Sequence, residues 1–370
     1  MNFLIVTNAP TLKKESNYFS YAPYVNEINI WLKYADQFAV LSPTVYNQEL
    51  LVSNFSKTPK LFSIPSLSFN SIPKAVKSVF YIPIILIKLY KAMVWADHIH
   101  LRCPGNIGLL GCFIQMFFPK KNKTAKYAGN WDPKAQQPLS YKLQKWILKN
   151  TFFTRNIQVL VYGNWRNQTR NIKPFFTATY SDSEKEKLNI RTYKGDLNFI
   201  FVGSLVKGKR PLLAVKIIKE LNKKNRRVYL DLYGDGVLKD EIQNYITNNK
   251  LDEFIRLHGN QPKKKLKEAL KKADFSLLLS KSEGWPKAVA EAMFFGVIPI
   301  ATSVSCVPFM LDNGNRGLLV QPNLQNAVFE IHKVLKNNVL MQKMSFRALE
   351  WSQRYTLSRF ETEIALLLKA

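Results

Sequence analysis

Two carboxylates eight residues apart mark the segment Ser282-Glu283-Gly284-Trp285-Pro286-Lys287-Ala288-Val289-Ala290-Glu291. Pro286 suits a first helical position, and the residues after it predict a helix over 287–295 that stops at Gly296. The free N–H groups and the dipole of such a helix start attract phosphate. Gly284 allows a tight turn ahead of it. Glu283 can then face the reacting end of a ligand, while Glu291 accepts hydroxyls farther along. The alternative is a chance pair, with Lys287 and Glu291 as a surface i, i+4 contact.

A second group of candidate ligands follows an apolar run at 197–202. Gly203 and Ser204 stand at the end of this predicted strand, and Lys209 and Arg210 come just before a helix that begins at Pro211. Cations at this position suit a diphosphate, with Lys209 acting as a point charge. The alternative is an ordinary turn with solvated lysines.

The elements that must position these residues alternate regularly in the C-terminal half. Apolar runs predict strands, and 3.6-residue periodicity predicts helices between them. We predict strands at 197–202, 228–232, 254–257, 275–279, 298–301 and 318–320, and helices at 211–222, 238–247, 264–271 and 287–295. This pattern is typical of a doubly wound domain, in which ligands bind beyond the carboxyl ends of the strands. His258 follows one such strand, as a ligand contact or, alternatively, as a structural histidine.

The N-terminal half shows a looser alternation, with predicted strands at 3–6, 38–41, 99–101, 125–127 and 159–162. Arg102 ends one strand, and Asn130 and Asp132 follow another. We interpret them as contacts to a ligand, with Arg102 suited to a phosphate and the other two to hydroxyls. The alternative is local turn formation, which favours Asn and Asp.

A chain of 370 residues is long enough for two domains. We predict an α/β domain at 1–180, a linker within 174–194 and a second α/β domain at 195–345. Two further helices are expected near 339–355 and 357–369.

The motifs from Ser280 to Val320 resemble the GT4 family of retaining glycosyltransferases. The likeness rests on Glu-Gly-Trp-Pro-Lys, on the Glu-x7-Glu spacing and on the later segment Asn313-Gly314-Asn315-Arg316-Gly317. The resemblance implies a GT-B fold, in which two Rossmann-like doubly wound domains face a central cleft and the last helix, about 356–370, crosses back to the first domain.

The resemblance also implies roles for residues. Lys209 and Glu283 would form the catalytic pair at the diphosphate and the transferred sugar. Glu291 would bind the ribose, and the neighbourhood of His258 the base. The turn Gly284, Trp285, Pro286 and Lys287 would lie near the sugar hydroxyls and the diphosphate. The donor would be a UDP- or GDP-sugar, and no other cofactor is implied.

Three departures from the family pattern concern ligand contacts. Ser204 stands where the family has arginine, so Arg210 or Lys207 would have to supply that phosphate contact. Phe309 replaces a glutamate, and the first loop, Thr7-Asn8-Ala9-Pro10-Thr11, lacks the glycine pair of many relatives. The first two changes bear on the donor. The last bears on the acceptor, and Arg102, Asn130 and Asp132 would be the acceptor-side residues.

A formal net charge of +28 calls for an anionic partner, although part of the excess can be plain solvated surface. Nucleic acid, an anionic membrane and phosphorylated substrates all qualify. The run Val79–Trp95 is the membrane candidate, and Pro83, Lys88 and Lys91 interrupt it. We interpret it as a core helix; the alternative is a helix in the membrane interface, and a transmembrane span is the least favoured reading.

Three cysteines without a disulfide or metal spacing predict a reducing compartment. The N-terminus has no basic segment of the kind that precedes a signal peptide. No Asp-x-Asp motif occurs, which predicts metal-independent chemistry.

We therefore expect a cytoplasmic glycosyltransferase, peripheral at the inner face of the cell membrane. It would move sugar from a nucleotide sugar to a glycan or polyprenyl-linked acceptor in bacterial surface polysaccharide synthesis, without binding nucleic acid. The alternatives are a basic nucleic-acid-binding protein and a GT-B nucleotide-sugar binder or epimerase that transfers no sugar.

Overall fold

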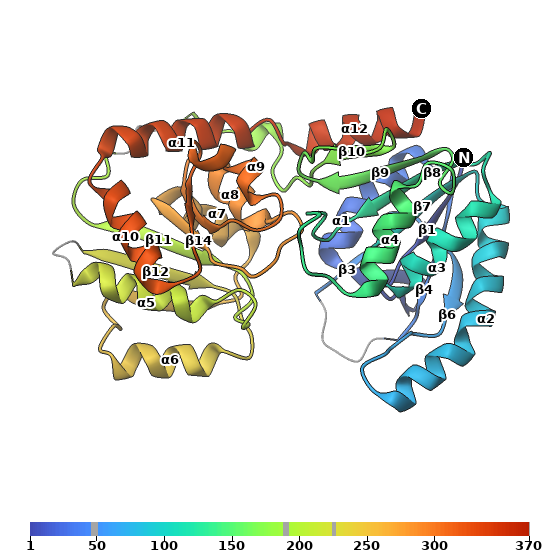
Figure 1. The fold of residues 1–370 in the computed structure, drawn as a ribbon, viewed down its shortest axis with the longest axis horizontal. Helices are drawn as coiled ribbons and strands as arrows, with labels where there is room; N and C mark the ends of the chain where they lie inside the picture. The colour runs from blue at the N-terminus through green and yellow to red at the C-terminus, as the bar shows by residue number, and fades with distance from the viewer. Residues whose placement is uncertain (46–50, 188–191, 224–226, 370) are drawn as a thin grey trace. The chain divides into compact units, whose positions relative to one another are not determined.

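The chain forms two compact units, each with a parallel sheet and helices (Figure 1). The computed structural model describes residues 1–45, 51–187, 192–223 and 227–369. One unit is Met1–Phe176 with the chain from Phe360 onward, and the other is Thr177–Arg359. The boundary falls inside the predicted linker. That linker prediction was partly wrong, because Ile172–Phe175 forms a strand of the first sheet. Residues 188–191 of the linker and residue 370 of the last helix lie outside the described residues.

The N-terminal unit has a seven-stranded sheet in the order β10-β9-β8-β7-β1-β4-β6, with every pair parallel. Its strands are β1 (Asn2–Val6), β4 (Gln37–Pro43), β6 (Lys60–Ile64), β7 (His98–Cys103), β8 (Asn122–Tyr127), β9 (Ile157–Tyr162) and β10 (Ile172–Phe175). Its helices are α1 (Ala22–Trp31), α2 (Ile72–Trp95), α3 (Asn106–Ile114), α4 (Leu139–Lys149), and most of α12 (Leu357–Lys369), with short 3-10 turns η1 (Leu32–Tyr34) and η2 (Gln115–Phe117). The strand order reverses between β1 and β7, which is where doubly wound sheets bind ligands.

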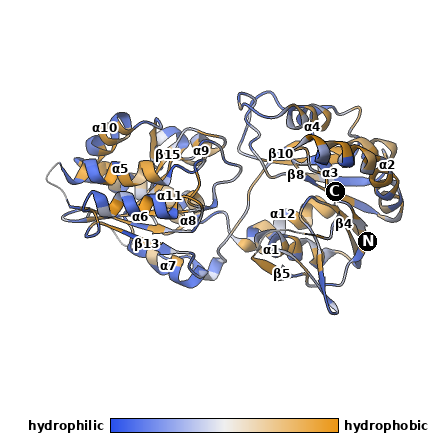
Figure 2. Cartoon of the chain, turned by 90° about the horizontal axis from the view of Figure 1, so that it is seen from below, coloured by the Kyte–Doolittle hydropathy of each residue, from blue (hydrophilic) through white to orange (hydrophobic). Residues whose placement is uncertain are grey.

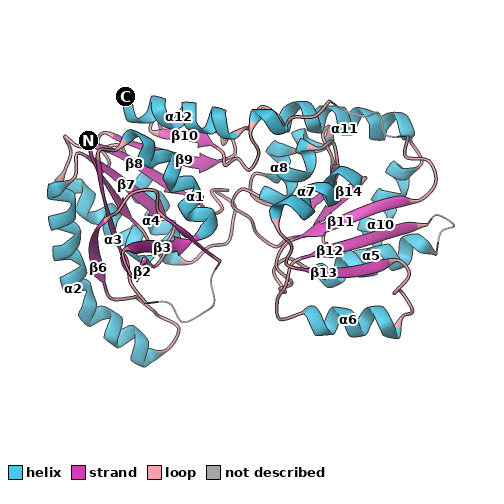
Figure 3. Ribbon diagram, turned by 180° about the vertical axis from the view of Figure 1, so that it is seen from behind, coloured by secondary structure: helices cyan, strands magenta, loops and turns pink. Residues whose placement is uncertain are grey.

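A small antiparallel sheet, which the sequence did not predict, joins the same unit (Figure 3). It consists of β2 (Leu12–Lys14), β3 (Asn17–Tyr21) and β5 (Val52–Asn54). These strands are only three to five residues long. Most of their side chains are partly or fully exposed, so no apolar run marks them.

The C-terminal unit has a six-stranded parallel sheet in the order β13-β12-β11-β14-β15-β16. Its strands are β11 (Leu197–Val202), β12 (Val228–Tyr233), β13 (Ile255–Gly259), β14 (Phe275–Leu278), β15 (Ile298–Thr302) and β16 (Leu318–Val320). Its helices are α5 (Pro211–Asn222), α6 (Lys239–Asn248), α7 (Lys263–Lys272), α8 (Lys287–Phe294), α9 (Val307–Met310), α10 (Leu324–Leu335) and α11 (Asn338–Ser352), with η3 (Asp182–Glu184) and η4 (Asp312–Gly314). The order reverses between β11 and β14.

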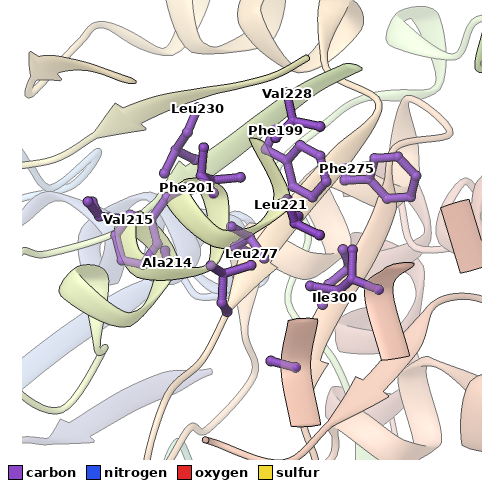
Figure 4. Packing of buried hydrophobic residues seen from close by; sticks show 14 of the residues in the cluster. Phe199, Phe201, Ala214, Val215, Leu221, Val228, Leu230, Phe275, Leu277 and Ile300 are labelled. Carbon is purple, nitrogen blue, oxygen red and sulfur yellow. The ribbon is translucent and has the colours of Figure 1, made fainter. Parts of the chain in front are cut away.

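The core of the C-terminal unit holds these central strands in place (Figure 4). Phe199 of β11 stacks on Phe275 of β14, with ring centroids 4.9 Å apart. Val215 and Leu221 of α5 are buried in the same cluster. Because apolar side chains fill both the strands and the facing helix, the carboxyl ends of β11 and β14 are fixed next to each other.

The interpretation of α2 as a core helix is only partly correct. Ile85, Leu89 and Met93 are fully buried, and α2 packs on β4 and β6. Only 28% of its most apolar stretch is buried, so it is not an ordinary core helix. In the described part of the chain, it is the one helix long and apolar enough to cross a membrane by length and composition.

Candidate functional site

The reversal point of the C-terminal sheet brings together two loops that the sequence analysis treated separately. Lys209 Nζ lies 2.5 Å from Glu283 Oε1. The Arg210 guanidinium donates to the Leu279 carbonyl at 2.8 Å, and the Lys281 N–H donates to the Gly208 carbonyl at 2.8 Å. The loop after β11 and the loop after β14 therefore form one surface at the carboxyl end of the sheet.

The Lys209 and Glu283 side chains differ in exposure. The lysine side chain is 31% exposed, whereas the glutamate is 8% exposed. Glu283 is thus held inside the loop, while the ammonium group still faces solvent on one side. A second anion can reach that ammonium group without unfolding the loop.

Two glycines allow the loops after β11 and β12 to approach each other closely. Gly203 N–H donates to the Tyr233 carbonyl at 2.9 Å. Gly234 has φ +139°, and a Cβ there would lie 2.0 Å from the Gly203 carbonyl oxygen. Only glycine fits, since such a contact has no flexible side chain to move. The neighbouring Ser204 is exposed at the strand end.

The helix after Glu283 begins at Lys287, as the predicted bounds 287–295 have it, and ends at Phe294. Pro286 is the flanking N-cap residue of α8, not its first helical residue. Gly284 is not among the glycines with positive φ, so the turn ahead of the helix does not depend on the conformational freedom of glycine that we expected it to use. At the other end Gly296, with φ +69°, donates to Met293 O and Val297 donates to Ala292 O, which closes the helix as a Schellman motif.

The start of α8 carries no capping side chain. Val289 and Ala290 donate backbone hydrogen bonds to the Pro286 carbonyl. The first-turn N–H groups ahead of them are those that a helix cannot satisfy internally. Together with Lys287, which is partly exposed, they make a positive helix end beside the Lys209 and Glu283 pair.

Side chains from later in the chain hold the turn between Glu283 and α8 in place. The Trp285 ring is buried and lies 6.2 Å from the Trp351 ring and 5.8 Å from the Tyr355 ring. Ser305 Oγ and Cys306 Sγ each donate to the Gly284 carbonyl at 3.2 Å. The Trp285 side chain therefore anchors the turn, and only its backbone faces the candidate site.

Glu291 lies inside α8 and is not a surface partner of Lys287. Its Oε1 accepts a hydrogen bond from Thr179 Oγ1 at 2.8 Å. Burial raises the pKa of Glu291, against the opposing effects of the Thr179 hydrogen bond and of Lys287 and Lys263. A carboxylate in this setting gains from additional hydroxyl donors.

His258 is held by two neighbours on β12. Its Nε2 lies 2.7 Å from Asp231 Oδ1, and its ring stacks on Tyr233 with centroids 4.5 Å apart. The three residues line one side of a cavity of about 770 Å³ between the sheet and α7. Lys264 and Lys265 line the same cavity. A contact between His258 and a nucleotide base stays a prediction.

The predicted acceptor residues of the N-terminal unit have internal partners. Arg102 pairs with Glu27 of α1, and Lys126 Nζ also lies 2.6 Å from Glu27. Burial would raise the pKa of Glu27, but Arg102 and Lys126 outweigh it and lower that pKa to about 2. Asn130 Oδ1 accepts the Asp132 N–H at 2.9 Å, as expected of a local turn. Their roles toward an acceptor stay predictions.

Sequence reasoning missed Thr179, Asp231 and Glu27 as partners of the candidate residues. Thr179 lies in the predicted linker, where no periodicity indicated an element. Asp231 sits within a strand and Glu27 within a helix. Their partners are distant in sequence, so only the fold reveals them.

Comparisons with known proteins point to one family. Residues 182–351 match the family model described as glycosyl transferases group 1. An uncharacterized glycosyltransferase of Methanocaldococcus jannaschii, MJ1178, is 28% identical over 188 residues, which are 50% of this chain and 51% of that protein. The poly(ribitol-phosphate) alpha-N-acetylglucosaminyltransferase of Staphylococcus aureus is 28% identical over 155 residues, 40% of this chain and 30% of that protein. The chain thus matches about half or less of the length of these relatives.

Solved structures resemble the whole chain in fold. Sucrose-phosphate synthase from Thermosynechococcus elongatus has a TM-score of 0.66 at 15% identity, covering 100% of this chain and 98% of that one. Anabaena Alr3699/HepE, in complex with UDP, has a TM-score of 0.67 at 12% identity, covering 100% and 99%.

Proposed function

We propose that the chain transfers a sugar from a nucleotide-diphosphate sugar to a hydroxyl acceptor, because residues 182–351 match the family model for glycosyl transferases group 1 and the chain has the GT-B fold. One observation carries this proposal. Lys209, Glu283 and the uncapped start of α8 meet at the reversal point of the C-terminal sheet. This is the place where doubly wound domains bind their ligands.

The proposed chemistry is departure of the nucleoside diphosphate with retention at the anomeric carbon. The bond from that carbon to the β-phosphate oxygen breaks, and its electron pair leaves on the diphosphate. The acceptor oxygen bonds to the carbon on the same face, and its proton passes to the departing phosphate oxygen. Negative charge grows on the diphosphate as this bond breaks. Lys209 and the N–H groups at the start of α8 are placed to stabilise that charge without a metal ion.

The two glutamates would divide the rest of the donor. We assign Glu291 to the ribose hydroxyls, because its carboxylate already accepts one hydroxyl hydrogen bond, from Thr179. Glu283 would accept from hydroxyls of the transferred sugar. His258, Ser204, Gly203 and Arg210 complete the proposed donor site.

For the acceptor we propose a glycan or polyprenyl-linked saccharide of bacterial surface polysaccharide synthesis. The support is the relatives named for colanic acid and amylovoran biosynthesis, which match parts of this chain at 28% and 26% identity. Arg102, Asn130 and Asp132 are the proposed acceptor-side residues. The proposed location is the cytoplasm, with peripheral attachment to the inner face of the cell membrane.

The test is a panel of UDP-, GDP- and ADP-sugars, scored for thermal protection and slow donor hydrolysis with and without EDTA. Lys209→Ala and Glu291→Ala should lose protection by the donor that protects the wild type. Lys333→Ala and Glu330→Ala on α10, away from the site, are the matched controls. The proposal fails if no sugar nucleotide protects the wild type, or if the site variants respond like the controls. Loss of activity in EDTA would refute metal independence alone.

A further inference from the structure

Helix α2 of the N-terminal unit has apolar side chains on two opposite faces. Its inner face packs on the sheet through Ile85, Leu89, Ala92 and Met93, which are all fully buried. Lys88 Nζ donates to the Ser63 carbonyl beside β6 at 2.5 Å. This anchoring leaves the opposite face of a 24-residue helix to solvent.

The outward face carries a continuous row of large apolar side chains, which we call the outer stripe. Four of them are strongly exposed: Ile72 at 81%, Phe80 at 77%, and Val79 and Ile87 at 56% each. The members follow one another at helical spacing along the whole helix, and Figure 2 shows its hydrophobic colouring. The outer stripe is Ile72, Val76, Val79, Phe80, Ile84, Ile87, Tyr90 and Val94.

The neighbouring helices extend this apolar surface. Helix α3 contacts both α2 and α4, so the three form one layer on the sheet. Phe117 in η2, directly after α3, is 70% exposed. Leu139 and Trp146 of α4 are 82% and 57% exposed and lie on one side of that helix. Contiguous exposed apolar surface of this kind marks an interaction site.

Cations border the outer stripe. Lys74, Lys77 and Lys91 of α2 are exposed along one flank. Between Leu51 and Phe176 the sequence contains only two acidic residues, Asp97 and Asp132, against lysines and arginines throughout. This imbalance gives the surroundings of α2 a positive potential.

A basic cavity adjoins the C-terminal end of α2. Lys121 Nζ donates to the carbonyls of Met93, Val94 and Ala96, which ties the turn before β8 to the end of the helix. The next residue back, Lys120, lines a cavity of about 860 Å³. Its cationic lining is Lys120, Lys123, Arg155 and Arg170, with His98 beside them.

We propose that the outer stripe of α2 docks the N-terminal unit on an anionic lipid bilayer. The helix would lie in the plane of the interface, with Phe80 and Ile87 among the acyl chains and the flanking lysines at the headgroups. An anionic bilayer matches both the apolar stripe and its cationic border. Nucleic acid would leave the stripe uncovered, and an apolar protein partner would leave the cations without a counterpart. The helix does not span the bilayer, because its inner face packs on the sheet.

This inference does not rest on the proposed sugar transfer, and its test needs no substrate. The full-length protein is co-sedimented with vesicles of neutral phosphatidylcholine, alone or mixed with anionic phosphatidylglycerol. We expect binding to the mixed vesicles, weaker binding in high salt, and little binding to neutral ones.

Two sets of variants, each with a matched control in the C-terminal unit, locate the surface. Phe80→Ser/Ile84→Ser/Ile87→Ser should weaken binding at least about tenfold, whereas Val237→Ser/Phe329→Ser/Phe346→Ser should bind like the wild type. We also expect weaker binding when the flanking lysines are removed in Lys74→Ala/Lys77→Ala/Lys91→Ala. The matched control Lys333→Ala/Lys336→Ala/Lys343→Ala should bind like the wild type. Unchanged melting temperatures would show that each variant is folded.

The proposal is overturned if the wild type ignores anionic vesicles, or if the α2 variants bind as tightly as their controls. Equal binding to neutral vesicles would refute the anionic requirement. Analytical ultracentrifugation without lipid provides the remaining outcome. A wild-type dimer that the serine variant of α2 abolishes would make the stripe an interface between two copies, and the lipid proposal wrong.

Discussion

At the scale of single residues, two buried carboxylates stand in opposite electrostatic surroundings. Glu27 lies between Arg102 and Lys126, whereas Glu291 accepts its hydrogen bond from the neutral Thr179 hydroxyl. The pKa of Glu27 is lowered to about 2, and the pKa of Glu291 is raised by burial. The charged form of Glu27 therefore stabilises the fold, whereas the charged form of Glu291 destabilises it. A destabilising charged group is expected where a side chain serves binding.

Glu291→Gln should give a protein at least as stable as the wild type at pH 7 that binds sugar nucleotides weakly. A raised pKa means that the native wild type binds a proton more tightly than the unfolded chain does. Wild-type stability relative to the glutamine variant should thus rise as pH falls toward the ordinary pKa of 4.5. Thermal melts from pH 4 to 7 measure this difference, with Glu330→Gln as the control. A variant that is less stable at pH 7 but binds the donor normally would contradict the assignment.

Glu27→Gln should destabilise the N-terminal unit by roughly 3–5 kcal/mol at pH 7, because two buried cations lose their counter-charge. A lowered pKa means that the contribution of Glu27 is complete above the unfolded value of 4.5 and is lost as pH falls toward about 2. The difference in free energy of unfolding between the wild type and Glu27→Gln should therefore become smaller as the pH is lowered. Urea unfolding at pH 7, 4 and 3 checks this, against the exposed Glu15→Gln. A difference in free energy of unfolding that does not change with pH would contradict this role of Glu27.

At the scale of elements, the sequence predicted long apolar runs well and short polar ones poorly. The bounds of β11, β16, α5 and α12 agree with the prediction, because apolar periodicity and Pro211 mark them clearly. Strand β10 was not predicted, and its last two residues were taken as linker, since Lys173 and Pro174 interrupt its apolar residues. Helix α10 was missed altogether.

The candidate site was predicted in parts that only the fold joins. Lys209 and Glu283 were each derived from a strand end, and their ion pair follows because β11 and β14 are neighbours in the sheet. The Thr179 hydroxyl carried no signal, as a threonine in an aperiodic segment has no preferred partner. The special conformation expected of Gly284 was wrong, because a glycine in a turn does not by itself require a positive φ.

The turn after β12 offers a test of how far this element controls the site. Gly234→Ala should lower the free energy of unfolding by more than about 2 kcal/mol and abolish donor protection, because the new Cβ meets the Gly203 carbonyl. Gly208→Ala, where no atom lies within 4 Å of the added Cβ, is the control and should stay within about 0.5 kcal/mol of the wild type. Chemical denaturation provides both values. Similar effects of the two substitutions would show that close packing of the turns is unimportant.

At the scale of the whole molecule, the two units have separate sheets with the same strand order around the reversal point. Each also has its own hydrophobic core. The proposed donor residues all lie in the C-terminal unit, whereas the apolar face of α2 lies in the N-terminal unit. A bound nucleotide sugar should therefore stabilise the C-terminal unit, and a bound lipid surface the N-terminal unit.

Calorimetry of the full chain should resolve two unfolding transitions that respond to different changes. Phe360 of α12 is buried against Phe175 and Phe176 in the N-terminal unit, so Phe360→Ala should cost that unit about 3–5 kcal/mol. A bound nucleotide sugar should raise only the other transition. If Phe360→Ala and the ligand shift the same transition, the units do not unfold independently.

The ion pair at the reversal point makes Glu283 an internal competitor for Lys209. In the proposed site, a donor diphosphate would have to draw the Lys209 ammonium group away from a carboxylate that lies 2.5 Å from it, and the carboxylate would pair with it again when the nucleoside diphosphate leaves. Such an exchange would lower the affinity for the nucleoside diphosphate product as well as for the nucleotide-sugar donor. We expect Glu283→Gln to bind free nucleoside diphosphate more tightly while turning over more slowly, a combination that isothermal titration and steady-state kinetics can separate.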